Sequence, residues 1–359
     1  MQLIQNKKLL TLSSILAFLV LLFGASFIKP IQKKTQQLKS AILNPKYEVS
    51  KITINFPITA RIELTNCGDF WGGFYQCGIS TNSSQYSFFF PVNTHMVESF
   101  LKLSKTVSDY NLVLEGKSKK DLKNLDETYE KYGLDDHHAT VLTFYDTENK
   151  SISKLYFGNF NQTMDQIFFK SDKKNSIYSM NSKIADYLEE DAKFWCDQDI
   201  IPKSISKNID SSKIQNIFYG EDEYPDELAR KKLSPVLKAS KNAYSKIASL
   251  RYGNLGPVYS YFIDPPDNYE NLFEPSQLNL ILTVKVIDDK STEYEYYFYR
   301  YNMKKFIDSE APDQYYYEMK ISPSMLYSDE AKKFIKKLNC KYYISEWTFN
   351  SLTQSLKEE

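Results

Sequence analysis

Two of the chain's three histidines stand side by side behind two aspartates, in the stretch KYGLDDHHATVLTFYD at residues 131–146. Imidazole nitrogens and carboxylates are common zinc ligands and common acid–base catalysts. A preceding glycine together with Asp135 and Asp136 is typical of a turn, and the alternating residues that follow predict a strand. We expect His137 and His138 to enter that strand, where neighbouring side chains point to opposite faces.

Histidines on opposite faces of a strand cannot easily bind one metal ion together, and the remaining histidine, His95, falls in the first turn of a predicted helix. We expect His95 to be exposed or to take part in capping. The sequence therefore predicts no metal-ligating, catalytic or cofactor-binding residues, and the protein is expected not to be an enzyme.

Three other patterns could carry chemistry, and each has a plainer interpretation. Ser-x-x-Lys occurs at 151–154 and 204–207, but neither context predicts the helix that serine acyl enzymes need. The acidic stretch 221–227 lacks the Gly-centred calcium loop and is typical of a solvated loop. The tyrosine-rich run 294–301 could stack sugars or peptides, although such runs are more often sheet core. Glycine-rich phosphate loops and His-Glu-x-x-His helices do not occur.

The cysteines leave two alternatives open. Cys67 and Cys77 bracket a segment whose Gly72-Gly73 predicts a hairpin turn, and cysteines on opposing arms of a hairpin could form a disulfide in an oxidising compartment. Alternatively, both are unpaired on a buried face. Cys196 and Cys340 stand alone, with a spacing that fits no zinc pattern.

Residues 9–28 contain no charged residue over 20 positions and follow Lys7-Lys8. At about 1.5 Å per residue this run matches a hydrocarbon core of about 30 Å, which predicts an uncleaved transmembrane anchor. Cleavage after a signal peptide is the alternative, because Gly24-Ala25-Ser26 could serve as a small-residue end. We expect residues 1–8 in the cytoplasm, a polar stalk over 29–48, and the large C-terminal region outside the cytoplasm, in a single-pass protein of the cell membrane.

Composition narrows the class of partner. Lys+Arg and Asp+Glu both number 45, so the formal net charge is zero, which argues against nucleic acid. With 28 Tyr and 23 Phe but only 11 Gly, the chain is enriched in residues that favour half-buried sheets.

The order of the predicted elements indicates an α+β fold with two similar lobes behind the transmembrane helix, each lobe an antiparallel sheet with packed helices. The first lobe is expected over 49–205 and the second over 206–359. Strands are predicted at 49–56, 60–66, 72–80, 85–92, 138–146, 151–160, 166–172, 175–180, 212–220, 278–288, 292–302 and 314–322, and helices at about 94–110, 182–194, 226–250 and 324–338.

The two series of elements run in the same order, which predicts an internal duplication. Leu142 and Leu282 are 140 positions apart, and Tyr156 and Tyr297 are 141 apart. The first helix of each lobe should cover the lobe's strands. Trp195 and Trp347 should then occupy equivalent places at the ends of the two closing helices.

Three stretches carry a resemblance to a known family. KYGLDDHHATVLTFYD, then KLYFGNF at 154–160, then the segment from IFFKSD to AKFW at 167–195, resemble the bacterial domain of unknown function 4340. Members tend to read Tyr-Gly-Leu before an alternating strand, then Ile-Gly or Phe-Gly at a strand end, then a strand pair closing on a helix and an aromatic residue. The resemblance covers about 49–202, most clearly 129–195. His137 stands where the family often has proline.

The resemblance implies one N-terminal anchor, a domain outside the cytoplasmic membrane and an association with ABC-type exporters of the gliding-motility kind, and it supplies no catalytic residues. The leading hypothesis is thus a membrane-anchored extracytoplasmic binding protein, auxiliary to an ABC-type exporter and partnered by its permease subunits. The alternative is a membrane-bound hydrolase or carbohydrate-active enzyme that uses paired carboxylates.

Overall fold

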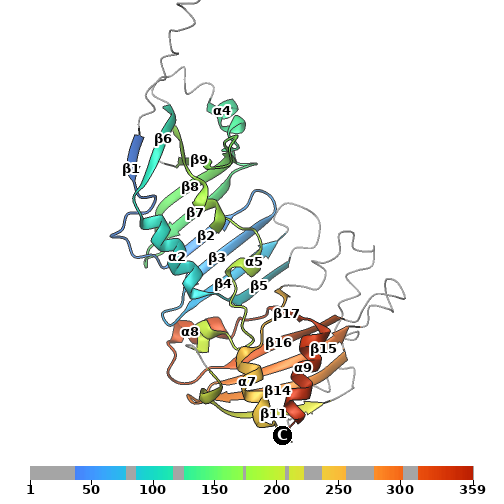
Figure 1. Ribbon diagram of the computed structural model, residues 1–359. Helices are drawn as coiled ribbons and strands as arrows, with labels where there is room; N and C mark the ends of the chain where they lie inside the picture. The colour runs from blue at the N-terminus through green and yellow to red at the C-terminus, as the bar shows by residue number, and fades with distance from the viewer. Residues whose placement is uncertain are drawn as a thin grey trace, which may run out of the picture.

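A computed structural model shows an α+β protein with two antiparallel sheets and few helices (Figure 1). The structure describes residues 37–77, 86–115, 125–172, 175–206, 210–221, 237–255, 279–301 and 314–358. Within these ranges, no helix combines the length and the apolar character that a bilayer crossing requires. The predicted anchor at 9–28 lies outside the described residues.

The first sheet has ten strands in the order β1-β6-β10-β9-β8-β7-β2-β3-β4-β5. Every neighbouring pair is antiparallel, including pairs such as β2–β7 whose strands are far apart in the chain. The strands are β1 (Gln37–Ser40), β2 (Lys51–Asn55), β3 (Ala60–Asn66), β4 (Trp71–Cys77), β5 (Tyr86–Pro91), β6 (Ser108–Glu115), β7 (Thr140–Tyr145), β8 (Ser151–Phe160), β9 (Gln166–Ser171) and β10 (Ser176–Asn181).

One face of this sheet is covered by α2 (Thr94–Lys105), together with the short helices η1 (Ser182–Tyr187) and α5 (Ala192–Trp195) (Figure 1). Asn93 caps α2 by accepting a hydrogen bond from the His95 backbone, as its position predicts. Phe100 of α2 is fully buried, and its ring packs against those of Phe144, Tyr187 and Trp195 at centroid distances of 5.8, 5.1 and 5.6 Å. This aromatic cluster joins the helices to the sheet.

The second sheet has seven strands in the order β12-β11-β14-β15-β16-β17-β13, and α7 and α9 lie side by side across one face (Figure 1). Phe349 of α9 packs on Phe298 of the sheet at 5.9 Å. The elements are η2 (Ser211–Lys213), β11 (Ile214–Glu221), β12 (Leu237–Lys238), α7 (Lys241–Ser249), β13 (Asn254–Leu255), β14 (Asn279–Asp288), β15 (Glu293–Tyr301), β16 (Gln314–Ser322), α8 (Asp329–Ile335), β17 (Lys341–Ile344) and α9 (Glu346–Lys357).

Six strands of each sheet share one arrangement. The order β6-β10-β9-β8-β7-β2 in the first sheet corresponds to β13-β17-β16-β15-β14-β11 in the second, and all pairs are antiparallel in both. Within each set of six, the first strand along the chain (β2 or β11) precedes a helix (α2 or α7), the next is the strand at the other end of the set (β6 or β13), and the last four (β7–β10 or β14–β17) follow in sequence order. The lobes differ in their additions: β1 and β3–β5 in the first, β12 and α8 in the second.

Details of the predicted correspondence need correction. Leu142 pairs with Leu155, whereas Leu282 pairs with Phe298, so the position equivalent to Tyr156 is Tyr299 rather than Tyr297. The two tryptophans are not equivalent either. Trp195 is fully buried, whereas Trp347 is 75% exposed. The reason is helical periodicity: Trp347 is the second residue of α9, and it points away from the face that buries Phe349, Leu352 and Leu356.

Several element boundaries also differ from the prediction. The predicted helix at 94–110 ends at Lys105, and β6 begins at Ser108; the closing helix at 182–194 is divided into η1 and α5. Of the predicted helix 226–250, the structure describes the part that contains α7, and residues 222–236 lie outside the described residues. Part of the predicted stalk is folded, because β1 pairs with β6 and Leu43 is fully buried. The sequence analysis missed α9.

The lobes meet where α8 packs on β4 and β5. The α8 N-cap, Ser328, donates its backbone N–H to the Asp69 carboxylate at 2.8 Å and its hydroxyl to the Cys67 carbonyl at 3.1 Å. The Phe334 ring lies 5.9 Å from that of Phe70 and 5.8 Å from that of Phe89. Buried residues of both sheets consequently belong to one continuous hydrophobic cluster.

Glycine on β4 permits this contact. A Cβ placed on Gly72 would lie 2.4 Å from the Phe334 ring, and one on Gly73 would lie 2.4 Å from the Phe90 ring. The expected hairpin turn at Gly72-Gly73 is therefore wrong. Both glycines are strand residues that leave room for aromatic rings, and the turn lies at residues 67–70, where Gly68 has φ +85°.

Replacing Gly72 with alanine should loosen the contact between the lobes. Because the new Cβ would overlap a packed phenyl ring, we expect a loss of about 1–3 kcal/mol in the free energy of unfolding, together with faster proteolysis around α8. Gly253→Ala is the matched control, since its Cβ would lie 3.4 Å from Tyr343, an ordinary contact. Equal thermal stability of the two variants would contradict the role assigned to Gly72.

Candidate functional site

The Asp-Asp-His-His stretch forms a turn that precedes β7. The Asp135 carboxylate accepts a hydrogen bond from the His137 backbone N–H at 2.9 Å and lies 2.8 Å from His138 Nδ1. The histidines do not enter the strand as expected, because this local hydrogen bonding holds them in the turn. Among the described residues, no group of three His, Cys, Asp or Glu side chains could hold a metal ion.

The other sequence patterns are dispersed over the fold. Ser151 and Lys154 lie on β8, and Ser204 lies in the short helix α6 (Lys203–Ser206), with residue 207 outside the described part. In the acidic stretch, Glu221 ends β11 and pairs with Lys357 at 2.7 Å, while 222–227 are not described. The tyrosine-rich run is β15. Its alternate residues Tyr294, Tyr296 and Phe298 are buried core. His95 is exposed on α2, 3.5 Å from Glu98.

Of the two alternatives for Cys67 and Cys77, a disulfide or unpaired thiols, the structure has both cysteines as free thiols. Cys67 lies in the turn before β4, whereas Cys77 ends β4 opposite Ala60. Six residue steps separate Trp71 from Cys77, the two ends of β4, and this span of roughly 20 Å is one that no disulfide can bridge. Burial raises the pKa of the Cys67 thiol to about 11.

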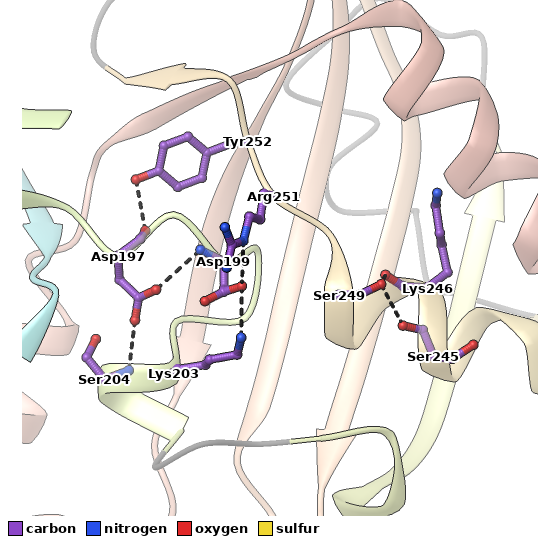
Figure 2. A network of polar contacts seen from close by, with 9 residues as sticks. All are labelled: Asp197, Asp199, Lys203, Ser204, Ser245, Lys246, Ser249, Arg251 and Tyr252. Carbon is purple, nitrogen blue, oxygen red and sulfur yellow. Dashed lines mark hydrogen bonds and ion pairs between the residues drawn. The ribbon is translucent and has the colours of Figure 1, made fainter. Parts of the chain in front are cut away.

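The segment that joins the lobes contains a buried carboxylate, Asp197, which is 6% exposed (Figure 2). Its two oxygens accept backbone N–H groups from Asp199 at 3.2 Å and Ser204 at 2.8 Å. Tyr252 donates its hydroxyl to the Asp197 carbonyl at 2.8 Å. Burial raises the pKa of the Asp197 carboxyl, and these backbone donors oppose that rise.

A second carboxylate of the same segment, that of Asp199, is paired with two cations. The Asp199 carboxylate lies 3.1 Å from Lys203 Nζ and 3.4 Å from Arg251 Nε (Figure 2). Because the carboxylate of Asp197 is directed at backbone amides of its own segment, this network is a structural clamp. The nearby serines Ser245 and Ser249 are bonded within α7 and take no part in it.

A cavity of about 610 Å³ lies on the helix-covered side of the first sheet near β1. It lies between the end of α2, the start of β6, the β9–β10 region and η1. This volume falls within the range of small-ligand sites, about 300–1,000 Å³. Its aliphatic lining residues include Ile42, Leu103, Val107, Met180 and Ile184.

Polar groups line the rest of this cavity. Tyr110 is 6% exposed, and its hydroxyl has no hydrogen-bond partner among the described residues. Gln166 accepts a hydrogen bond from Ser179 at 2.7 Å through its side-chain oxygen. Two cations and two carboxylates stand at the mouth: Lys39, Lys183, Asp109 and Asp165. The candidate functional site is this cavity.

Sequence reasoning missed the cavity for a physical reason. Its walls come from segments between residues 39 and 184, and Tyr110 was assigned to the end of a helix. A tyrosine on an alternating strand is ordinary core, and an unpartnered hydroxyl does not single Tyr110 out, because those of Tyr317 and Tyr342 also lack a partner among the described residues.

The two motifs that carried the family resemblance contact each other. Gly133, with φ +66°, ends α4 (Leu125–Lys131), and Asn159 donates its backbone N–H to the Tyr132 carbonyl at 2.8 Å. A Cβ on Gly158 would lie 2.2 Å from that carbonyl oxygen. Leu134 is fully buried beside the turn. The Tyr-Gly-Leu turn and the Phe-Gly strand end are therefore one packing unit.

These features define a class: a two-lobed α+β protein with antiparallel sheets and a cavity under the helices of its first lobe. The sequence profile of the family described as "Domain of unknown function (DUF4340)" matches residues 92–282, more than half of the chain. The chain belongs to this family, as the resemblance predicted. The match begins at α2 and extends into β14, so it reaches further into the second lobe than the expected 49–202. Comparison with curated proteins and with solved structures gave no match.

Substituting Gly158 with alanine should destabilise the first lobe by about 1–3 kcal/mol, because the new Cβ would overlap backbone atoms that cannot rotate away. Chemical denaturation would measure this loss. A stability equal to that of the unsubstituted chain would mean that the motif glycine does not serve the packing of the Tyr-Gly-Leu turn.

Asp197→Asn tests the clamp. Asparagine keeps one acceptor but directs an NH₂ group at a backbone N–H, so we expect a loss of about 1–3 kcal/mol in unfolding free energy. The folded-state pKa of Asp197 is raised above its unfolded value, so the folded chain binds this proton more tightly than the unfolded chain. The free energy of unfolding of the unsubstituted chain should therefore fall as pH rises through the raised pKa. The effect of the substitution should thus be larger near about pH 4 than near about pH 7. The reverse trend in denaturant titrations would contradict this assignment.

Proposed function

We propose that this protein is a membrane-anchored extracytoplasmic binding protein that serves as an auxiliary subunit of an ABC-type exporter complex. The observation that carries the proposal is the run of 20 uncharged residues at 9–28, which is long enough to cross a bilayer. The family match over residues 92–282 supports it only through the association with ABC-type exporters that the resemblance implies. In this proposal the large C-terminal region lies outside the cytoplasm, and the first eight residues remain inside.

The placement of β1 supports a defined orientation to the membrane. Nine residue steps separate Ile28 from Gln37, which at about 3.4 Å per residue allows at most roughly 30 Å between the end of the apolar run and β1. Strand β1 lies in the first lobe on the side away from the second sheet (Figure 1). The first lobe, with its cavity, would thus be membrane-proximal.

The shared order and direction of six strands support a further proposal, that the two lobes arose by internal duplication. After duplication, the first copy acquired β3–β5 and β1, and the second acquired α8. Superposing the six shared strands of each lobe should align all of them in the same direction. An alignment that matches only part of each set would contradict a common origin.

Two measurements on membranes test the proposed function. The intact chain should remain in the pellet after an alkaline carbonate wash, whereas a Leu16→Arg, Leu19→Arg variant should be released, because each arginine at the centre of the run costs about 3 kcal/mol of insertion free energy. Cross-linking followed by mass spectrometry should identify ABC permease subunits with the intact chain. The variant is the control for this capture.

A shortened mature form in the soluble fraction would show that the segment is cleaved and would overturn the anchor. Cross-linked membranes that contain the intact chain without permease subunits would overturn the exporter assignment.

A further inference from the structure

The last strand of the first sheet, β5, has a composition that favours pairing with a further strand. Its sequence, YSFFFP, contains no charged residue, and four of its six residues are aromatic. Uncharged segments of high β-propensity pair readily with other chains when they lie at the edge of a sheet. Strand β5 lies at such an edge, with β4 as its neighbour on one side.

The hydrogen bonds around β5 show which of its backbone groups face away from β4. Val92, directly after the strand, donates its backbone N–H to the Trp71 carbonyl of β4 at 3.3 Å. Backbone groups of alternate residues face the same side of a strand, so those of Ser87, Phe89 and Pro91 face outwards. A further strand would form its hydrogen bonds with these three residues.

The segment that joins the lobes occupies the Pro91 end of this edge. Asp197 donates its backbone N–H to the Pro91 carbonyl at 2.9 Å, next to an antiparallel bridge between Val92 and Cys196. The edge thus accepts a strand in antiparallel orientation, and the joining segment covers only its last position.

Three residues at the end of α8 and in the loop after it cover the next outward position, Phe89. The side-chain oxygen of Asn339 accepts the Phe89 backbone N–H at 2.8 Å, the bond that a carbonyl of an added strand would otherwise make. The Phe334 ring packs edge to face on the Phe89 ring at 5.8 Å, and Lys337 Nζ lies 5.5 Å from the centroid of that ring. A lysine at a sheet edge disfavours the approach of an apolar strand.

We propose that residues 334–339 of the second lobe block the edge of the first sheet, and that the partner they exclude is β5 of a second copy of this chain. An antiparallel pairing centred on Phe88 would place Ser87 of one copy opposite Phe89 of the other, so that each pair exchanges both of its backbone hydrogen bonds. A second copy fits because this pairing is self-complementary and joins two uncharged aromatic strands. The role is independent of the proposed exporter function.

Sedimentation velocity of full-length variants in detergent micelles tests the proposal, because any association through the membrane segment is common to all of them. The double variant Lys337→Gln, Asn339→Ala removes the charge and the amide oxygen, and its dimer dissociation constant should fall at least about tenfold. Asn339→Ala alone should have a smaller effect in the same direction without lowering the melting temperature, since the lost hydrogen bond is exposed.

Two control variants match these substitutions. Asn339→Asp keeps an acceptor oxygen for the Phe89 N–H, and Lys336→Gln removes the exposed lysine next to Lys337. Both controls should associate no more than the unsubstituted chain.

Hydrogen exchange locates the contact between copies. Ser87 is exposed and its backbone N–H faces outwards, so this amide should exchange more slowly as the concentration of the double variant rises, whereas β1 at the opposite edge should not change.

Equal association of the double variant and Lys336→Gln would overturn the proposal. Association that protects β1 instead of β5, or that accompanies a loss of sheet signal in circular dichroism, would overturn it as well. Protection of Ser87 in the unsubstituted chain by a membrane protein would show that the edge is open to a partner, and would refute the blocking role.

Discussion

The structure depends on the short segment from Trp195 to Ser206, whose backbone is bonded into both lobes. On one side Asn93 donates to the Trp195 carbonyl and Asp197 donates to the Pro91 carbonyl; on the other, Ile200 donates to the Leu250 carbonyl. Between these hydrogen bonds the chain turns, and the turn buries the carboxylate of Asp197. Burying a carboxylate costs free energy unless its oxygens accept hydrogen bonds. Two backbone N–H groups of the same segment provide those bonds. The connection is thus a folded element that is bonded to both lobes.

Elements in which the lobes differ make a second contact between them. The shared six strands and their helices form each lobe's own core, and the additions α8 and β3–β5 make the second contact between the lobes. Gly72 and Phe334 are complementary at that contact, because only a residue without Cβ leaves room for the ring. If the lobes arose by duplication, the contact between them is formed by elements that each copy acquired separately.

The family signature and the candidate site lie on different parts of the first lobe. The Tyr-Gly-Leu turn and the Phe-Gly strand end pack on each other through backbone atoms, so their residue types follow from close approach and positive φ. The cavity instead lies under α2 and η1 and draws its walls from segments without a recognisable motif. All of the lining residues except Lys39 and Ile42 nevertheless lie within the stretch that the family profile matches.

Local sequence determined most of the strands, the Asn93 cap of α2 and the turn at Gly133, because alternation, capping and positive φ depend on residues close in the chain. It also identified the family. Tertiary structure decided the rest. Gly72 and Gly73 have the residue types of a turn, yet their place is set by rings from α8 and β5. The free state of Cys67 and Cys77 follows from strand register, and the exposure of Trp347 from which face of α9 is buried. The cavity beside β1 exists only because helices and strands distant in sequence enclose it, and such enclosure is a property of three-dimensional packing that spacing along a chain cannot encode.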